Sequence, residues 1–287
     1  MNALYLFSVA PFVEFGFMQR ALLGSLMLSI GAGPVGVFLT LRRMSLTGDA
    51  MAHAILPGAA AGFLLYGLEL VPMTIGGLVA GMVVALGAGA VSRFTVQKED
   101  ASMAAFYLIA LSVGVVMVSM RGSSIDLMHV LFGTVLALNT DALTLIALVT
   151  LTTLITMMVF KRALIAECLD PLFLRSVSKL GSPVHFIFLG LVVLNLVAGF
   201  QALGTLLSVG LMVLPATAAR FWTSRVETMC VVAIAIGLLS SIGGLLLSYH
   251  FSLPSGPAII LSAGVIYAGS VLAAPRGVLA TMRPRTS

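Results

Sequence analysis

Long apolar runs are the feature that most constrains what this chain can fold into. Stretches of about 18 to 25 residues that are nearly free of charge recur along the whole sequence. A helix of that length crosses about 30 Å of hydrocarbon, whereas barrel strands are about half as long and alternate in polarity. Charged residues make up 9% of the chain, against about a quarter in soluble domains. We therefore predict an all-α polytopic membrane protein.

Nine segments are apolar enough to be predicted as spans. They cover residues 17–41, 49–67, 71–92, 103–120, 142–160, 185–201, 203–220, 227–249 and 256–274. Another segment, 125–138, is too short and too polar at its start for a regular span and suits a re-entrant piece. We expect eight to nine transmembrane helices and a single transmembrane domain over residues 1–287.

Most basic residues lie in the connections between the apolar runs. If each run crosses the membrane once, these connections fall on the same side of the membrane. The clearest examples are Arg42, Arg43, Arg93, Lys161 and Arg162. By the positive-inside rule this side faces the cytoplasm, which leaves the N-terminus outside and the C-terminus inside. We expect a multi-pass protein of the inner (cytoplasmic) membrane. The net charge of +5 comes from such single and paired residues, so nucleic acid is not an expected partner.

Asp49 and His53 are the polar residues that most need a functional explanation. An ionisable side chain inside a span costs about 2.5–3.5 kcal/mol, so one that is kept there is a candidate functional group. Four residues apart, the two share one helix face, with about 6 Å of rise between them. Carboxylate oxygen and imidazole nitrogen suit Zn²⁺, Mn²⁺ or Fe²⁺. Two copies of the chain on a two-fold axis would bring four such ligands together.

A structural explanation of this pair is also open. Asp49 lies near a membrane edge, where it could neutralise Arg42 or Arg43. His53 could donate a hydrogen bond to a carbonyl that Pro57 leaves without its helical partner. On the residues alone the two explanations carry similar weight.

Other prolines and histidines give weaker signals. Pro57 and Pro215 lie inside apolar runs and predict kinked helices, which transporters tolerate where neighbouring groups satisfy the freed carbonyls. His129, His185 and His250 lie near span ends or near the doubtful segment, and none has a carboxylate four residues away. We expect these three histidines at the membrane interface.

The absence of several motifs excludes enzymatic classes. The sequence contains no GxxxxGK[ST] phosphate loop, no G-x-S-x-G elbow and no H-E-x-x-H helix. The chain is thus expected to be a transport subunit and not an enzyme, with ATP hydrolysis left to a separate protein. Residues 161–184 mix charge with Leu and Phe at helical spacing and predict a short amphipathic helix at the cytoplasmic surface. Such a helix either docks on a partner or lies at the interface without one.

One stretch carries a family resemblance. LRRMSLTGDAMAHAILPGAAAGFLL resembles the signature region of the zinc/manganese/iron-type ABC transporter permeases. Residues 204–222 and 253–261 are similar to two further motifs of that family, and the segment around Asp170 is similar to its ATPase-docking loop. The resemblance therefore covers nearly the whole chain. One departure is the stretch 250–253, HFSL, where these permeases often carry an acidic residue.

The resemblance implies an ABC importer permease of about eight spans that works as a homodimer or as a pair of different permeases. It implies a cytoplasmic ATP-binding subunit and a periplasmic or extracellular metal-binding protein as partners. Asp49 and His53 match the family's metal positions. The ATPase-docking residues would be Asp170, Pro171, Leu172, Phe173 and Arg175. The transported ion would be Zn²⁺ or Mn²⁺, with Fe²⁺ less favoured, and no cofactor would be bound permanently.

Three other functions stay open. An ion-coupled secondary transporter would use Asp49 and His53 to carry protons, and it would usually show two related halves, which this sequence does not display. An ABC permease for a metal chelate would need a wide cavity instead of bare-ion ligands. A non-transporting assembly subunit would tolerate Asp49→Ala.

Overall fold

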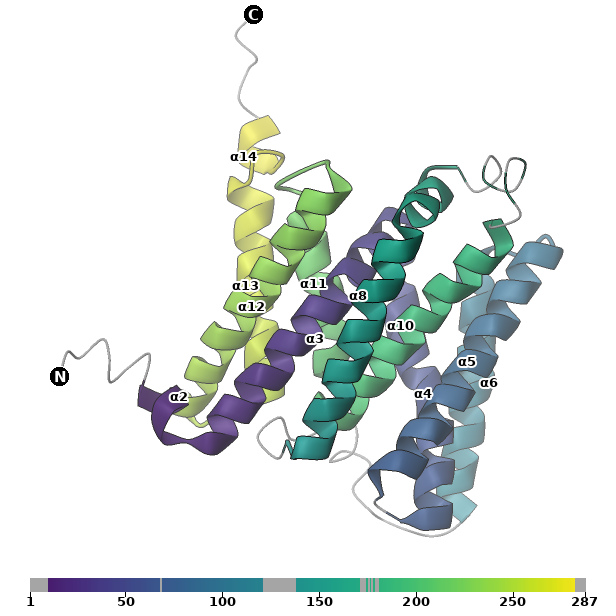
Figure 1. Ribbon diagram of the computed structural model, residues 1–287, viewed down its shortest axis with the longest axis horizontal. Helices are drawn as coiled ribbons and strands as arrows, with labels where there is room; N and C mark the ends of the chain where they lie inside the picture. Colours follow the sequence, from purple (N-terminus) through teal and green to yellow (C-terminus); the bar gives the residue numbers. More distant parts are fainter. Residues whose placement is uncertain are drawn as a thin grey trace, which may run out of the picture.

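The chain folds into a bundle of long helices that run roughly alongside one another (Figure 1). The structure, a computed structural model, describes residues 10–67, 69–120, 138–170, 174, 176, 178 and 181–281. Within this part of the chain there are helices and connecting turns but no strand. The helices are α2 (Ala10–Glu14), α3 (Gly16–Leu41), α4 (Ser45–Tyr66), α5 (Leu70–Phe94), α6 (Glu99–Met120), α8 (Thr140–Leu169), α10 (Gly181–Leu203), α11 (Thr205–Ala219), α12 (Val226–Phe251), α13 (Ser255–Ala273) and α14 (Val278–Thr281).

Eight of these helices are long and apolar enough to cross a membrane, which confirms the predicted multi-pass all-helical fold. The ninth predicted span, 203–220, contains only the 15-residue helix α11. At 1.5 Å per residue α11 is about 22 Å long, short of the roughly 30 Å of hydrocarbon. It begins directly after Gly204, whose φ of 93° turns the chain sharply out of α10. The predicted re-entrant segment, 125–138, lies outside the described residues except for Leu138.

Helices α3 and α10 are the most deeply buried spans, and α4, α8 and α11 contact both of them. Large apolar side chains on the outer faces of α5, α6, α8 and α13 are exposed, as expected for surfaces that meet lipid. Burial on one side and lipid on the other explains why these helices are hydrophobic all round.

Glycines allow several helices to approach at backbone distance. On α4, Gly58 lies against the carbonyl of Gly76 on α5, and Gly62 lies against the carbonyl of Pro72. A Cβ atom at either α4 position would collide with α5 backbone, so only glycine permits this contact. Helices α4 and α5 consequently make the most extensive pairwise contact in the described bundle, followed by α4 and α6.

Most of the described basic residues lie at the end of the bundle where α3, α5 and α8 end, the upper end in Figure 1, whereas Arg20 lies near the start of α3. We call this upper end the basic end. It holds Arg42 after α3, Arg93 in the last turn of α5, and Lys161 on α8, which pairs with Glu227 at the start of α12. The connection from α3 to α4 is a tight turn in which Arg43 takes a φ of 61°.

The amphipathic helix predicted for residues 161–184 does not begin as a separate helix. Residues 161–169 continue α8, which is 30 residues long, and residues 181–184 already belong to α10. At about 45 Å, α8 is longer than the roughly 30 Å of hydrocarbon, and its last turns carry the polar residues Lys161, Arg162 and Glu167. The predicted boundaries were therefore wrong. Between them Leu174 and Ser176 are helical, and a short helix in the middle of the segment stays a prediction.

Candidate metal centre

Asp49 and His53 lie one turn apart near the start of α4, on the same face. The distance from Asp49 Oδ1 to His53 Nε2 is 3.8 Å. The side chain of Asp49 is 68% exposed and that of His53 is 39% exposed on the single chain. Both groups are therefore available to an ion or to a second protein.

The two residues belong to a stripe of incompletely buried side chains that runs the length of α4. Leu46, Ala50, Leu56, Ala60 and Phe63 continue this stripe at helical spacing. The opposite face of α4 is buried against α5 and α6. The stripe is therefore a partly apolar surface that carries one acid and one imidazole in the first turns of α4.

One copy of the chain supplies only two ligands at this place. In the part of the chain that the structure describes, no group of three or more His, Cys, Asp or Glu side chains is close enough to hold an ion. Two ligands bind a metal weakly, while the four ligands of a two-fold pair would complete a Zn²⁺ or Mn²⁺ shell with or without water.

The arginines near Asp49 have other roles. Arg42 turns away from α4 and pairs with Glu167, 3.3 Å from its Oε1. No contact between Asp49 and Arg42 or Arg43 occurs among the described residues. Neither arginine therefore pairs with Asp49 within the described part of the chain.

Pro57 and its surroundings shape the helix next to the pair. The proline lies inside the continuous helix α4 and lacks an N–H, so the carbonyl of His53, four residues earlier, loses its normal helical partner. Gly114 of α6 packs directly on Pro57, and the ring of Tyr107, also on α6, lies 6.4 Å from the imidazole of His53. Pro215 is likewise inside a continuous helix, α11. The kinks predicted at both prolines stay predictions.

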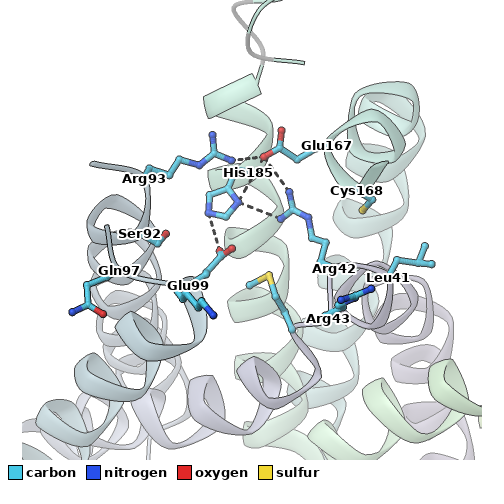
Figure 2. A pocket seen from close by; sticks show the side chains of 12 residues that line it. Leu41, Arg42, Arg43, Ser92, Arg93, Gln97, Glu99, Glu167, Cys168 and His185 are labelled. Carbon is cyan, nitrogen blue, oxygen red and sulfur yellow. Dashed lines mark hydrogen bonds and ion pairs between the residues drawn. The ribbon is translucent and has the colours of Figure 1, made fainter. Parts of the chain in front are cut away.

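A second set of charged residues lies inside the basic end, and Figure 2 shows how its members converge. Glu167, in the last turn of α8, is 1% exposed; its Oε1 atom accepts a hydrogen bond from Arg93 and forms an ion pair with Arg42. A carboxylate near a helix C-terminus is disfavoured by the helix dipole, and the two guanidinium groups offset that cost. We call Arg42, Arg93, Glu99, Glu167 and His185 the charged cluster.

His185 joins the charged cluster from the first turns of α10. Its Nε2 atom lies 3.0 Å from Glu99 Oε1, and its Nδ1 atom lies 3.3 Å from a guanidinium nitrogen of Arg42. Since a guanidinium can only donate, Nδ1 accepts and the ring proton resides on Nε2, toward Glu99. The Nε2–Glu99 contact is short but is not aligned as a hydrogen bond. The prediction of an interfacial His185 was wrong, because the side chain is 3% exposed.

The charged cluster lines a hollow of about 510 Å³ at the basic end, with Arg43, Gln97, Lys98 and Cys168 also on its wall. The charges of the two arginines and the two glutamates of the cluster balance. Sequence spacing could not reveal this set, because its members come from five different helix ends. The only local signal was a glutamate, Glu167, within a predicted apolar helix face.

Of the predicted ATPase-docking residues, only Asp170 lies in the described part. It is the exposed residue that ends α8. Pro171, Leu172, Phe173 and Arg175 lie outside the described residues. We call residues 170–180, between α8 and α10, the docking segment.

Comparisons with known proteins place the chain among transport proteins. The model of the "ABC 3 transport family" matches residues 14–274. The manganese transport system membrane protein MntC of Listeria innocua is 31% identical over 92% of this chain and 93% of its own length. A protein of Haemophilus influenzae named "Probable iron transport system membrane protein" is 33% identical over 87% of this chain and 90% of its own.

Solved structures agree with the observed fold. PsaBC from Streptococcus pneumoniae, solved with a Fab, aligns with a TM-score of 0.81 at 30% identity and covers 93% of this chain and 95% of that one. An inward-facing ABC transporter described as metal-chelate type aligns with a TM-score of 0.68 over 93% of this chain and 87% of that one, at 13% identity, which supports the fold alone. The resemblance seen in the sequence is thereby confirmed, and the chain belongs to the ABC 3 transport family of metal-transporting membrane permeases.

Proposed function

We propose that this chain is the membrane permease of an ABC importer that carries Mn²⁺ across the cytoplasmic membrane. The observation that carries the proposal is the Asp49–His53 pair, two ligand types that suit Mn²⁺, open on the surface of a membrane helix. The relatives named for manganese transport favour Mn²⁺ among the ions that these ligands accept. Zn²⁺ and Fe²⁺ are the second candidates, since imidazole also suits both.

The exposure of Asp49 supports a homodimer. A carboxylate facing lipid costs about 2.5–3.5 kcal/mol on insertion scales, so the α4 stripe is expected to be covered by another protein surface. A second copy of the chain would bring its own Asp49 and His53 to the same place. The resulting two-fold site has the ligand number that a single copy lacks.

A two-fold symmetric site that binds the metal ion weakly would allow transport. A metal-binding protein outside the membrane would release the ion between the two α4 helices, where it would be held by up to four ligands. A cytoplasmic ATP-binding subunit would dock near residues 170–180 and move the helices. Because the ion must leave as well as enter, a site of moderate affinity suits conduction better than a tight one.

The test is a measurement of total cell metal by mass spectrometry. A metal-starved host without its own importers would express this chain with its ATP-binding and metal-binding partners. The double variant Asp49→Asn, His53→Ala is compared with the unchanged chain at equal membrane abundance. Asp141→Asn, an exposed acid in the first turn of α8, is the matched control.

We expect manganese to rise with the unchanged chain and with Asp141→Asn but not with the double variant. A rise in zinc or iron instead would reassign the ion and keep the importer. Equal manganese in all three strains would show that the pair is structural. Uptake that persists without the ATP-binding subunit would favour the secondary transporter.

A further inference from the structure

We propose that Glu167 transmits the movement of the docking segment to α4, the helix that carries Asp49 and His53. Glu167 would then be a positioning residue for transport. This inference rests on the proposed function, because it requires an ATP-binding subunit that acts at residues 170–180. The reasoning starts from the place of Glu167 in α8.

Glu167 lies three residues before Asp170, where the docking segment begins. Helix α8 is continuous from Thr140 to Leu169, so Glu167 belongs to the same rigid turn that ends at the docking segment. A displacement of that segment therefore moves the carboxylate of Glu167 with it.

The first link from Glu167 to α4 runs through Arg42. The guanidinium of Arg42 lies 3.3 Å from Glu167 Oε1 and stacks over the ring of Phe188, 4.7 Å from its centroid. Only Arg43 and the buried Met44 separate Arg42 from the start of α4. Because this turn is so short, a shift of Arg42 displaces the beginning of α4.

The second link runs through Arg93 at the end of α5. Arg93 donates to Glu167 and also, at 3.3 Å, to the carbonyl of Gly181 at the start of α10. Helix α5 packs on α4 at backbone distance through Gly58 and Gly76. A movement of α5 is thus passed to α4 along its length.

The third link runs through His185 to α6. His185 Nδ1 lies 4.0 Å from Glu167 Oε1, and its Nε2 faces Glu99, the first residue of α6. Helix α6 touches α4 at Pro57 through Gly114. The three links from Glu167 thus lead to α3, α5 and α6, and each of these helices contacts α4, the helix of the proposed metal site.

The charged cluster can change its pairing while its ion pairs stay shielded from most of the solvent. The side chains of Arg42 and Arg93 are 8% and 6% exposed and that of Glu167 is 1% exposed, although the cluster borders the hollow at the basic end. Both arginines use Oε1, while the buried Oε2 has no hydrogen-bond partner among the described residues. The carboxylate can therefore exchange partners between two oxygens without losing its charge balance, as expected of a two-state element.

The test separates transport from ATP hydrolysis. The complete complex of permease, ATP-binding subunit and metal-binding protein is placed in vesicles, and Mn²⁺ uptake and ATP hydrolysis are measured in the same sample. Glu167→Gln keeps the size of the side chain and removes its charge. We expect uptake per ATP hydrolysed to fall about tenfold, within the range typical of coupling between sites, while hydrolysis and the yield of assembled complex are kept.

Glu227→Gln is the matched control. Glu227 also pairs with a basic residue of α8 at the basic end, 3.1 Å from Lys161, but its side chain is 58% exposed and it lies outside the charged cluster. We expect its ratio of uptake to hydrolysis to equal that of the unchanged chain.

Three outcomes overturn the inference. The first is an unchanged ratio in Glu167→Gln, and the second is a parallel loss of uptake and hydrolysis in a Glu167→Gln complex that still assembles. If Glu167→Gln does not assemble, Arg42→Lys replaces it, since lysine keeps the charge but cannot serve Glu167 and His185 with one planar group. The third outcome is a normal ratio, or no assembly, for that variant. Absence of Mn²⁺ uptake by the unchanged complex would instead contradict the proposed function.

Discussion

On α4, the carboxylate oxygen Oδ1 of Asp49 lies 3.8 Å from Nε2 of His53, and neither side chain is buried by the rest of the chain. The same face carries Leu46, which is 80% exposed, and Ala50. A charged pair beside apolar side chains on a spanning helix is a surface that needs a protein neighbour. Under the proposed function, a second copy of the chain would be this neighbour and would complete the set of metal ligands.

A cross-link across this surface tests the homodimer. With Cys168 and Cys230 replaced by serine, Ala50→Cys is expected to give a covalent dimer when membranes are treated with a short bifunctional maleimide. Val116→Cys is the control and is expected to stay monomeric. Val116 lies on α6 and is 57% exposed. Denaturing gels read out both. A monomer with Ala50→Cys, or equal dimer in both variants, would contradict the predicted interface.

Metal uptake is expected to weaken as the pH falls from about 7 to about 5. Protons compete with the metal for the His53 imidazole and the Asp49 carboxylate, so binding is lost on the acidic side and kept on the neutral side. The measurement is Mn²⁺ uptake in vesicles with the inside pH and the rate of ATP hydrolysis held constant. Uptake that stays flat over this range would argue against a histidine ligand.

The contact between α4 and α5 is expected to be sensitive to a single methyl group. Gly58→Ala places a Cβ atom against the carbonyl of Gly76, which the backbone cannot accommodate without moving. Overpacking of this kind costs about 1–3 kcal/mol. The expected result is a lower Tm in detergent and reduced uptake. Gly264→Ala, inside α13 with nothing within 4 Å of the new Cβ, should leave both unchanged.

A buried hydrogen bond between α8 and α10 is expected to contribute little to the free energy of unfolding. Asn195 Nδ2 donates to Thr153 Oγ1 at 2.8 Å, and both side chains are almost fully buried. Hydrogen bonds between membrane helices average about 0.6 kcal/mol in double-mutant cycles. A cycle of Asn195→Ala and Thr153→Val, read from unfolding in mixed micelles, should give a coupling of that size. Thr152→Val is the control, because its hydroxyl bonds only to its own helix.

Features that depend on local spacing could be predicted from the sequence. The helical spans are encoded in runs of apolar residues, and eight of the nine segments form helices long enough to cross a membrane. The shared face of Asp49 and His53 follows from a separation of four residues on one helix. The short length of α11 could not be predicted from the sequence. Gly204, where the chain turns, and Thr205, where α11 begins, both lie inside an apolar run.

Features that depend on contacts between distant segments were decided only by the tertiary structure. Glu167 meets Arg42 and Arg93 across gaps of 125 and 74 residues, and His185 is buried by α3 and α6 rather than left at the interface. No periodicity in the sequence records such pairings, since they result from which helix ends the packing brings together. The sequence by itself therefore determined the spans, the family and the shared helix face of Asp49 and His53, while the packing of five helix ends created the charged cluster.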